Sequence, residues 1–180
     1  MLSPKTRGSR PITDRVKESL LNVLYKYGLP DGAIVADLFC GVGSLGLEAL
    51  SRGAELVTFV EKDPRIIATL KTNIEKAGFV KESKIIRANA FKVGAVIDSA
   101  ARKYDLVFVD PPYSATRNVG AGSTLGGLLD LLVDQAIEGG IVVIRTGRDV
   151  SLLDRYGRFE ISERRQWGTM AVTILAKSAL

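Results

Sequence analysis

Residues 34–61 read IVADLFCGVGSLGLEALSRGAELVTFVE and contain the complete pattern of one structural unit. The apolar run from Ile34 to Phe39 predicts a buried strand, and the run from Leu56 to Val60 predicts a second one. Between them, Gly41-Val42-Gly43-Ser44-Leu45-Gly46 fits G-x-G-x-x-G and opens a helical segment. Glu61 ends the second strand. This order of strand, glycine loop, helix, strand and acid indicates a site for a nucleoside-containing cofactor.

The same alternation of apolar runs and helical patterns continues through most of the chain. Further strands are predicted at 85–88, 105–109 and 141–144, and helices at 45–50, 64–77, 91–101 and 125–137. Gly78 is a suitable residue to end the helix at 64–77. Strands that alternate with helices pair in parallel, with helices on both faces of the sheet. The chain is therefore predicted to have an α/β fold with one mostly parallel sheet.

The two ends of the chain follow other patterns. Near the front, apolar residues from Val16 to Tyr27 lie on one face of a predicted helix, with Thr13 as its N-cap. Near the back, the β-rich runs 159–167 and 169–176 are separated by Gly168, which predicts a hairpin. Such a hairpin adds an antiparallel edge to the parallel sheet.

Composition excludes several classes of chemistry. The 180 residues include one cysteine, Cys40, and no histidine, which excludes an internal disulfide, a histidine general base and histidine-ligated metal. No run of 18 apolar residues exists, and the polar, basic residues 1–10 do not form a signal peptide. We therefore expect a cytoplasmic protein without metal or membrane association. The net charge of +5 makes a polyanionic partner plausible.

An acid within the first strand indicates which cofactor the glycine loop binds. Asp37 lies four residues before Gly41, where its charge would repel a pyrophosphate but would attract an ammonium and a sulfonium. That favours S-adenosylmethionine over a dinucleotide, with Asp37 near the amino group and Glu61 on the ribose hydroxyls. Asn89 either hydrogen-bonds the adenine or caps the next helix. The simpler alternative for the loop is a tight strand-to-helix turn with Glu61 merely solvated.

The tetrapeptide Asp110-Pro111-Pro112-Tyr113 ends the fourth strand. Two prolines stop the sheet ladder and fix φ, so the acceptors on Asp110 and on the carbonyl of Pro111 point rigidly to one place. An exocyclic amine on an aromatic base is a poor nucleophile that needs such acceptors when it attacks a methyl sulfonium. Tyr113 would stack on a base that has left its helix. The alternative is a rigid turn with a buried tyrosine.

These motifs resemble the RsmD-like methyltransferases, which methylate the exocyclic N2 of one guanine in bacterial 16S ribosomal RNA. The resemblance runs from Arg10 to about Ala176. It rests on six segments, which in chain order are Arg10 to Glu18, the glycine-loop region 37–50, Ser51-Arg52-Gly53-Ala54, Val60-Glu61-Lys62-Asp63, Asp110-Pro111-Pro112-Tyr113 and Trp167-Gly168-Thr169. The Asp-Pro-Pro-Tyr motif is shared with methyltransferases that act on DNA adenine and on protein glutamine. The segment that begins Arg10-Pro11 favours the RsmD-like family among these methyltransferases.

The resemblance implies a Rossmann-like class I methyltransferase fold with seven strands, the last of them antiparallel. It implies an N-terminal basic segment and helix at 1–30 and a methyltransferase domain at 31–180. Direct methyl transfer to the guanine amine would need no metal, and the partner would be ribosomal RNA, within a 30S particle or its assembly intermediate. We expect a monomer. The chain departs from the family's usual acids at Arg145, after the fifth strand, and at Asn89.

The candidate site residues fall into three groups. The catalytic group is Asp110, Pro111, Pro112 and Tyr113. The group expected to bind S-adenosylmethionine is Asp37, Phe39, Gly41, Gly43, Gly46, Glu61, Lys62, Asn89 and Ala90. The group expected to bind RNA is Arg10, Thr13, Arg15 and Arg117. The resemblance implies that Arg10 and Thr13 lie near the entrance to the site, Arg15 belongs to the basic cluster at the front, and Arg117 lies in a loop from which it could reach a phosphate.

Other functions remain open on the sequence alone. The same fold could methylate DNA adenine N6 or a protein glutamine, with specificity in the loop 114–124. A non-catalytic RNA-binding partner subunit is a second alternative, disfavoured by the intact glycine loop and by Asp110. A dinucleotide oxidoreductase is disfavoured by Asp37. Methylation at C5 of a pyrimidine would need a nucleophilic thiolate, and Cys40 lies in the glycine loop rather than in a catalytic loop.

Overall fold

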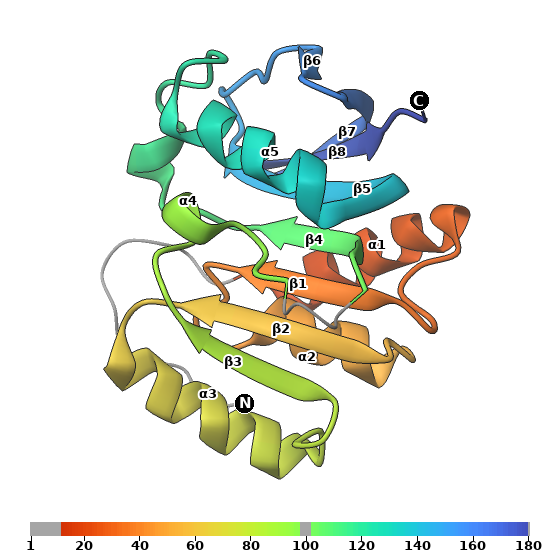
Figure 1. The fold of residues 1–180 in the computed structure, drawn as a ribbon, viewed down its shortest axis with the longest axis vertical. Coiled ribbons are helices and arrows are strands. Elements are labelled where there is room, and N and C mark those ends of the chain that lie inside the picture. The colour runs from red at the N-terminus through yellow and green to blue at the C-terminus, as the bar shows by residue number, and fades with distance from the viewer. Residues whose placement is uncertain (1–11, 98–101, 180) are drawn as a thin grey trace.

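A computed structural model of the protein describes residues 12–97 and 102–179, and it contains one eight-stranded sheet in the order β3-β2-β1-β4-β5-β8-β7-β6 (Figure 1). The strands are β1 (Ile34–Leu38), β2 (Leu56–Glu61), β3 (Ser83–Arg87), β4 (Tyr104–Val109), β5 (Ala136–Gly147), β6 (Arg155–Tyr156), β7 (Phe159–Trp167) and β8 (Met170–Lys177). The helices are α1 (Asp14–Leu24), α2 (Ser44–Ser51), α3 (Pro64–Ala77), α4 (Ala90–Val93) and α5 (Thr124–Gln135), with short 3-10 helices η1 (Tyr25–Tyr27) and η2 (Tyr113–Thr116).

The sheet is parallel from β3 to β5 and antiparallel beyond it. Strand β8 pairs antiparallel with both β5 and β7, and β6 pairs antiparallel with β7. The predicted hairpin and the antiparallel last strand are therefore confirmed. As predicted, the hairpin ends the parallel sheet in an antiparallel edge, with β8 between β5 and β7. The expected count of seven strands is wrong, because Arg155–Tyr156 pairs with Phe159 and Glu160 as an additional short strand.

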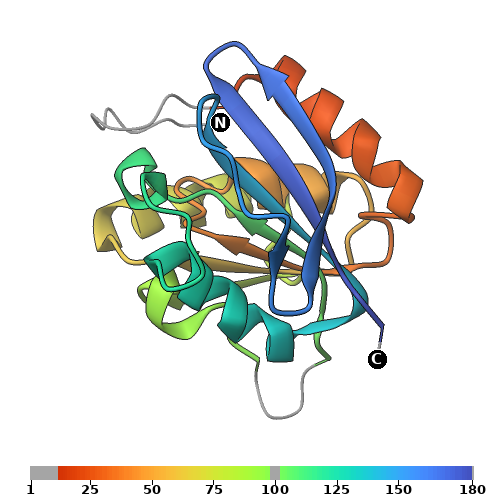
Figure 2. The same ribbon diagram turned by 90° about the horizontal axis from the view of Figure 1, so that it is seen from above.

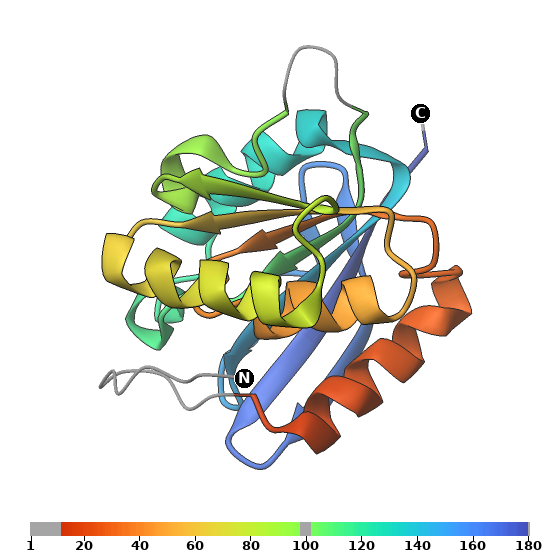
Figure 3. The same cartoon turned by 90° about the horizontal axis from the view of Figure 1, so that it is seen from below.

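Helices cover both faces of the sheet, as predicted. Alternate residues along β4 face opposite sides, so that Phe108 packs in one apolar cluster and Val107 in the other. The first cluster is completed by α1, α2 and α3, and the second by α4 and α5. Figure 3 shows these two groups of helices on opposite sides of the strands.

Helix α1 lies beside the β7–β8 hairpin (Figure 2). In η1, which continues α1, the hydroxyl group of Tyr27 is 2.8 Å from that of Ser162, and Lys26 pairs with Glu163. At its start, Thr13 caps the helix as predicted, because its Oγ1 accepts a hydrogen bond from the Val16 N–H. The first helix therefore packs against a strand that lies far from it in the sequence.

Helix α4 is shorter than the predicted helix at 91–101. It ends at Val93 because Gly94 has a φ of 61°. The side chain of Gln135 completes this end, since its Oε1 accepts from the Ala95 N–H and its Nε2 donates to the Val93 carbonyl. Residues 98–101 of the predicted helix lie outside the described residues.

Helix α5 and strand β5 meet earlier than the sequence pattern predicts. The helix ends at Gln135, and Ile137 belongs to β5, which is much longer than the predicted 141–144. The bounds of α3 and its end at Gly78, the left-handed C-cap, are as predicted. The structure adds that Asp63 is the N-cap and that Pro64 lies in the first turn. No helix in the part of the chain that is described has the length and apolar character needed to span a bilayer.

Candidate active site

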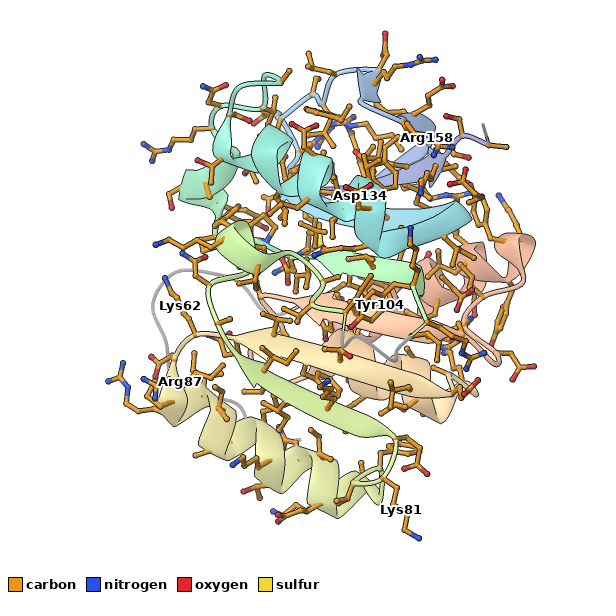
Figure 4. All side chains as sticks on the ribbon, in the orientation of Figure 1. Lys62, Lys81, Arg87, Tyr104, Asp134 and Arg158 are labelled. Carbon is orange, nitrogen blue, oxygen red and sulfur yellow. The ribbon has the colours of Figure 1, made fainter. Side chains whose placement is uncertain are left out.

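The residues predicted to bind the cofactor and to act in catalysis gather where the parallel strands end. The register pairs Leu38 of β1 with Val60 of β2 and with Val109 of β4, so the residues that follow these strands emerge at one edge of the sheet. Figure 4 shows Lys62 and Arg87 at this edge and Tyr104 at the beginning of β4, away from it. In open α/β sheets, ligands bind outside the carboxyl ends of the strands. The arrangement therefore places the glycine loop, Glu61 and Asp110 where a ligand is expected.

The three loop glycines are required for different physical reasons. Gly41 has a φ of 56°, and a side chain there would enter open space. A Cβ on Gly43 would lie 2.5 Å from Leu70, and one on Gly46 would lie 2.4 Å from Phe59. Gly43 and Gly46 thus let the loop and α2 pack closely on β2 and α3. The open space at Gly41 is a place where a ligand can approach the backbone.

Gly46→Ala is expected to destabilise the fold by about 1–3 kcal/mol, because the added methyl group overpacks the Phe59 and Val57 side chains. Gly127→Ala in α5 is the matched control, since a Cβ there meets no atom within 4 Å. That substitution is expected to stabilise the helix by about 0.5–1 kcal/mol. Urea unfolding of the two variants measures both effects. Equal effects of the same sign would contradict the packing role of Gly46.

Asp37 is buried beneath the glycine loop, with 1% of its surface exposed. Its Oδ2 accepts a hydrogen bond from the Gly46 N–H at 2.8 Å, which ties the strand end to the first turn of α2. Burial raises the pKa of Asp37 from 3.8 to about 7, and the charges of Asp110 and Glu61 add to this increase. A buried acid of this kind is stabilised in its ionised form by a cationic ligand.

Glu61 is held by backbone amides at the end of β2. Its Oε2 accepts from the Gly41 N–H at 3.2 Å, and its Oε1 accepts from the N–H groups of Lys62 and Asp63. The exposed Lys62 thus orients the Glu61 carboxylate through its backbone. These bonds fix the direction of the carboxylate, so that it can accept from ligand hydroxyls without reorganising. The solvated alternative for Glu61 is wrong, since the residue is buried.

Two aromatic rings lie next to this loop. Phe39 has a φ of 58°, which an aromatic residue rarely adopts. Its ring is 4.6 Å from the ring of Phe91, centroid to centroid. Phe39 was predicted from the sequence as a site residue, whereas Phe91 was not. The backbone strain at Phe39 is of the kind that is concentrated at functional sites.

Asn89 acts as a helix cap, one of the two roles that the sequence left open. Its Oδ1 accepts from the Phe91 N–H at 3.1 Å at the start of α4. Its side-chain nitrogen takes no part in this bond, and the residue is exposed. The Ala90 side chain is buried in the apolar cluster under α4. Contacts of either residue with adenine stay predictions.

The Asp-Pro-Pro-Tyr segment leaves β4 as the sequence predicts. The Asp110 N–H donates to the Leu38 carbonyl, which holds the end of β4 beside β1. Pro112 is extended, and the chain then turns into η2, which begins at Tyr113. The Thr116 hydroxyl donates a hydrogen bond to the Tyr113 carbonyl. Pro111 is buried, whereas Tyr113 is half-buried rather than fully buried. The turn is therefore rigid, and Asp110 is fixed at the strand end.

Asp110 carries an ion pair that the sequence analysis missed. Arg145 of β5 donates from Nε to Oδ1 of Asp110 at 2.6 Å. Burial raises the pKa of Asp110, and the guanidinium opposes that change. From the sequence, Arg145 stood out as a departure from a family pattern, and no contact with Asp110 was predicted for it. The register of β4 and β5, which a single sequence does not reveal, brings the two residues together.

The residues predicted to bind RNA do not join this cluster as a group. Arg15 lines a groove of about 400 Å³ between α1 and β7, together with Lys26 and Arg165. Thr13 lies at the N-terminus of α1, and Arg117 is exposed after η2. Arg10 lies outside the described residues. RNA contacts of these residues stay predictions.

Comparison with known proteins identifies the family. A sequence profile described as "Conserved hypothetical protein 95" matches residues 1–176. A Bacillus subtilis protein named "Putative rRNA methyltransferase YlbH" is 33% identical over 174 residues, which cover 94% of this chain and 88% of that protein. The chain belongs to the RsmD-like methyltransferase family. The resemblance found in the sequence is thereby confirmed.

Other RsmD-like relatives match over a shorter segment. The Escherichia coli protein named "Ribosomal RNA small subunit methyltransferase D" is 38% identical over 112 residues, or 61% of this chain and 52% of that protein. The chain thus matches about half the length of this relative. A solved structure titled "Putative methyltransferase yhhF from Escherichia coli" superposes with a TM-score of 0.77 and 26% identity, covering 99% of this chain and 92% of that one.

Family membership and fold together confirm the predicted class. The mostly parallel sheet with an antiparallel C-terminal strand is that of class I methyltransferases. S-adenosylmethionine, the cofactor predicted from the sequence, agrees with this RsmD-like membership. The described residues also fit that molecule, since the buried acid Asp37 favours a cationic ligand, and Gly41 leaves open space beside Glu61.

Proposed function

We propose that this protein transfers a methyl group from S-adenosylmethionine to the exocyclic N2 amine of a guanine in 16S ribosomal RNA. The observation that carries the proposal is the placement of Asp110. Its carboxylate lies at the end of β4, fixed by the bond to Leu38 and by two prolines, beside the β1 end that carries Asp37. A rigid acceptor next to a cofactor loop is what a weakly nucleophilic amine requires.

The chain's own residues would hold the cofactor at the strand ends. Asp37 would attract its ammonium group, and Glu61 would accept hydrogen bonds from its ribose hydroxyls. The aromatic rings of Phe39 and Phe91 and the exposed Asn89 lie where the adenine would be bound. When bound, S-adenosylmethionine supplies an electrophilic methyl group whose carbon–sulfur bond breaks, with the electron pair staying on sulfur.

Asp110 and Pro111 would prepare the amine for attack. The Asp110 carboxylate and the Pro111 carbonyl accept hydrogen bonds from the two amine hydrogens and so direct the nitrogen lone pair toward the methyl group. The nitrogen forms the new bond to carbon and becomes cationic. It then loses a proton to Asp110 or to water, since a methylated ammonium on an aromatic ring is acidic. Tyr113 would stack on the extruded base.

Ribosomal RNA is favoured as substrate by the printed names of the relatives, which include the small subunit methyltransferase D of Escherichia coli. The net charge of +5 is compatible with a polyanionic substrate. Guanine N2 is favoured over DNA adenine N6 and protein glutamine by the front segment that resembles the family. The thiol of Cys40 is buried, and burial raises its pKa well above the usual range, which disfavours attack on a pyrimidine C5.

Transfer of radiolabelled methyl from S-adenosylmethionine tests the proposal. The substrates are 30S subunits, naked 16S ribosomal RNA, duplex DNA and a protein extract, followed by nucleoside and amino-acid analysis. Label in N2-methylguanosine of the RNA is the expected result, and 30S labelled faster than naked RNA would identify the particle as substrate. Label only in DNA or protein would overturn the RNA assignment. Binding of cofactor without transfer to any substrate would favour a non-catalytic partner.

The cellular setting is part of the same proposal. We infer a cytoplasmic monomer that acts on the 30S particle or its assembly intermediate. Sedimentation of the purified protein, alone and with 30S subunits, tests the monomeric state and the association with the 30S particle. A stable dimer, or the absence of co-sedimentation at low salt, would contradict them.

A further inference from the structure

The ion pair between Arg145 and Asp110 has no role in the mechanism above. The register pairs Val109 of β4 with Ile144 of β5, so Asp110 and Arg145 are the next residues on two adjacent strands. Their contact, 2.6 Å from Nε to Oδ1, is short, as expected for a charge-assisted hydrogen bond. The Arg145 side chain is only 6% exposed, and that of Asp110 is 19% exposed. This is therefore a buried pair rather than a surface one.

The surroundings explain why a cation is needed there. Asp37 on β1 and Glu61 at the end of β2 interact electrostatically with one another, and Asp110, directly after β4, interacts with Asp37. The thiol of Cys40 lies in the same loop. On its other side, Arg145 pairs in the sheet with the apolar Val172 of β8. Arg145 is thus a cation in direct contact with Asp110, close to the acidic side chains of Asp37 and Glu61.

The ion pair also distinguishes the two carboxylate oxygens of Asp110. The Arg145 Nε–H occupies Oδ1, and Oδ2 takes no part in this bond. The bond from the Asp110 N–H to Leu38 fixes the backbone, and the guanidinium fixes the rotation of the carboxylate about its side-chain bonds. The backbone and the side chain of Asp110 are thereby both oriented.

We propose that Arg145 is a positioning residue for methyl transfer, which keeps Asp110 as an oriented, ionised acceptor with Oδ2 directed to the amine. This inference rests on the proposed function, because it assigns Asp110 to the acceptor amine. A protonated Asp110 would accept only weakly from the amine and could not take the proton that the methylated amine loses. Arg145 opposes that protonation, and its place on β5 is rigid because the strand is paired on both sides.

Arg145→Met tests the proposal through the pH profile of kcat. Without the guanidinium, the acid limb of the profile is expected to move to higher pH by about one unit or more. The value of kcat at neutral pH is expected to fall about tenfold to a hundredfold, with the KM for S-adenosylmethionine unchanged. Arg145→Lys, which keeps the charge, is expected to restore the acid limb and to recover part of kcat.

The control is Arg155→Met on β6, which removes an arginine whose side chain is 66% exposed. It is expected to leave the profile unchanged, since exposed ion pairs contribute little. Thermal unfolding of each variant identifies loss of fold. If Arg145→Met is unstable, the double variant Arg145→Met/Asp110→Asn shows whether the unpaired Asp110 charge is the cause. The pH profile is then measured on Arg145→Lys, which keeps the positive charge.

A measurement that needs no activity separates this inference from the proposed function. Carbon-13 NMR follows the titration of the Asp110 carboxyl, identified by the signal that Asp110→Asn removes. The titration midpoint is expected to rise in Arg145→Met and to return in Arg145→Lys. An unchanged midpoint and an unchanged pH profile would overturn the role of Arg145. Methylation of DNA or protein instead of RNA, with the shift intact, would overturn only the substrate.

Discussion

Asp110→Asn is expected to lower the rate of methyl transfer by about a hundredfold to a thousandfold while leaving the affinity for S-adenosylmethionine unchanged. The asparagine has the same shape, but it replaces an anionic acceptor with a neutral amide. That amide accepts more weakly and presents a donor on its second atom. Single-turnover transfer to the accepted substrate measures the rate, and isothermal titration measures cofactor binding.

The matched control is Asp130→Asn on α5, where the aspartate is exposed and lies on an element away from the strand ends. That variant is expected to retain full activity. Because Asp110→Asn leaves Arg145 without its carboxylate, thermal unfolding of the variant is measured in parallel. Normal turnover by folded Asp110→Asn would exclude the acceptor role. An equal loss of cofactor affinity would place Asp110 in cofactor binding instead.

Asp37→Asn is expected to weaken the binding of S-adenosylmethionine by about tenfold to a hundredfold, because a charge-assisted contact worth about 1.5–3 kcal/mol is lost. The asparagine oxygen can still accept from the Gly46 N–H, so the loop is expected to keep its conformation. Cofactor binding by the wild type is expected to strengthen as the pH rises through about 7, where Asp37 ionises. In Asp37→Asn this dependence is expected to disappear.

The same carboxyl makes the stability of the cofactor-free protein depend on pH. The folded-state pKa of about 7 lies above the ordinary value of 3.8, so between these values the folded protein holds a proton that the unfolded chain has released. The contribution of Asp37 to stability is therefore full below about pH 4 and is lost as the pH rises to 7. Urea unfolding at pH 5 to 8 is expected to show Asp37→Asn gaining stability relative to the wild type over this range.

Two results would contradict this account of Asp37. One is cofactor affinity in Asp37→Asn equal to that of the wild type at pH 8. The other is a difference in unfolding free energy between the two proteins that stays constant with pH. Glu18→Gln on α1 is a suitable control, since Glu18 is exposed and lines the groove between α1 and β7 rather than the strand ends.

Local patterns in the sequence were sufficient for much of the fold. The apolar runs predicted β1, β2 and β4 because parallel strands are buried on both faces. Thr13, Gly78 and Gly168 marked a helix start, a helix end and a hairpin turn, and each of these depends on the chain within a few residues. Helix α4 was predicted too long because its end depends on Gln135, about forty residues away.

Contacts between strands could not be predicted in the same way. The pairing of Asp110 with Arg145 depends on the register of β4 against β5, and the bond from Gly46 to Asp37 depends on how α2 docks on β1. The ring of Phe91 meets Phe39 only after α4 is placed. An arginine directly after the apolar run 141–144 was the available signal, and it pointed to Arg145 without identifying its partner.

The position of β8 has a consequence for how the chain folds during synthesis. Because residues 170–177 insert between β5 and β7, β7 cannot join the body of the sheet until β8 has left the ribosome. Until then β5 remains an open edge with apolar residues on both faces, and Tyr27 and Lys26 of η1 lack their contacts with Ser162 and Glu163. A transcript truncated before residue 170 would therefore yield a nascent chain prone to edge-to-edge aggregation and a substrate for chaperones.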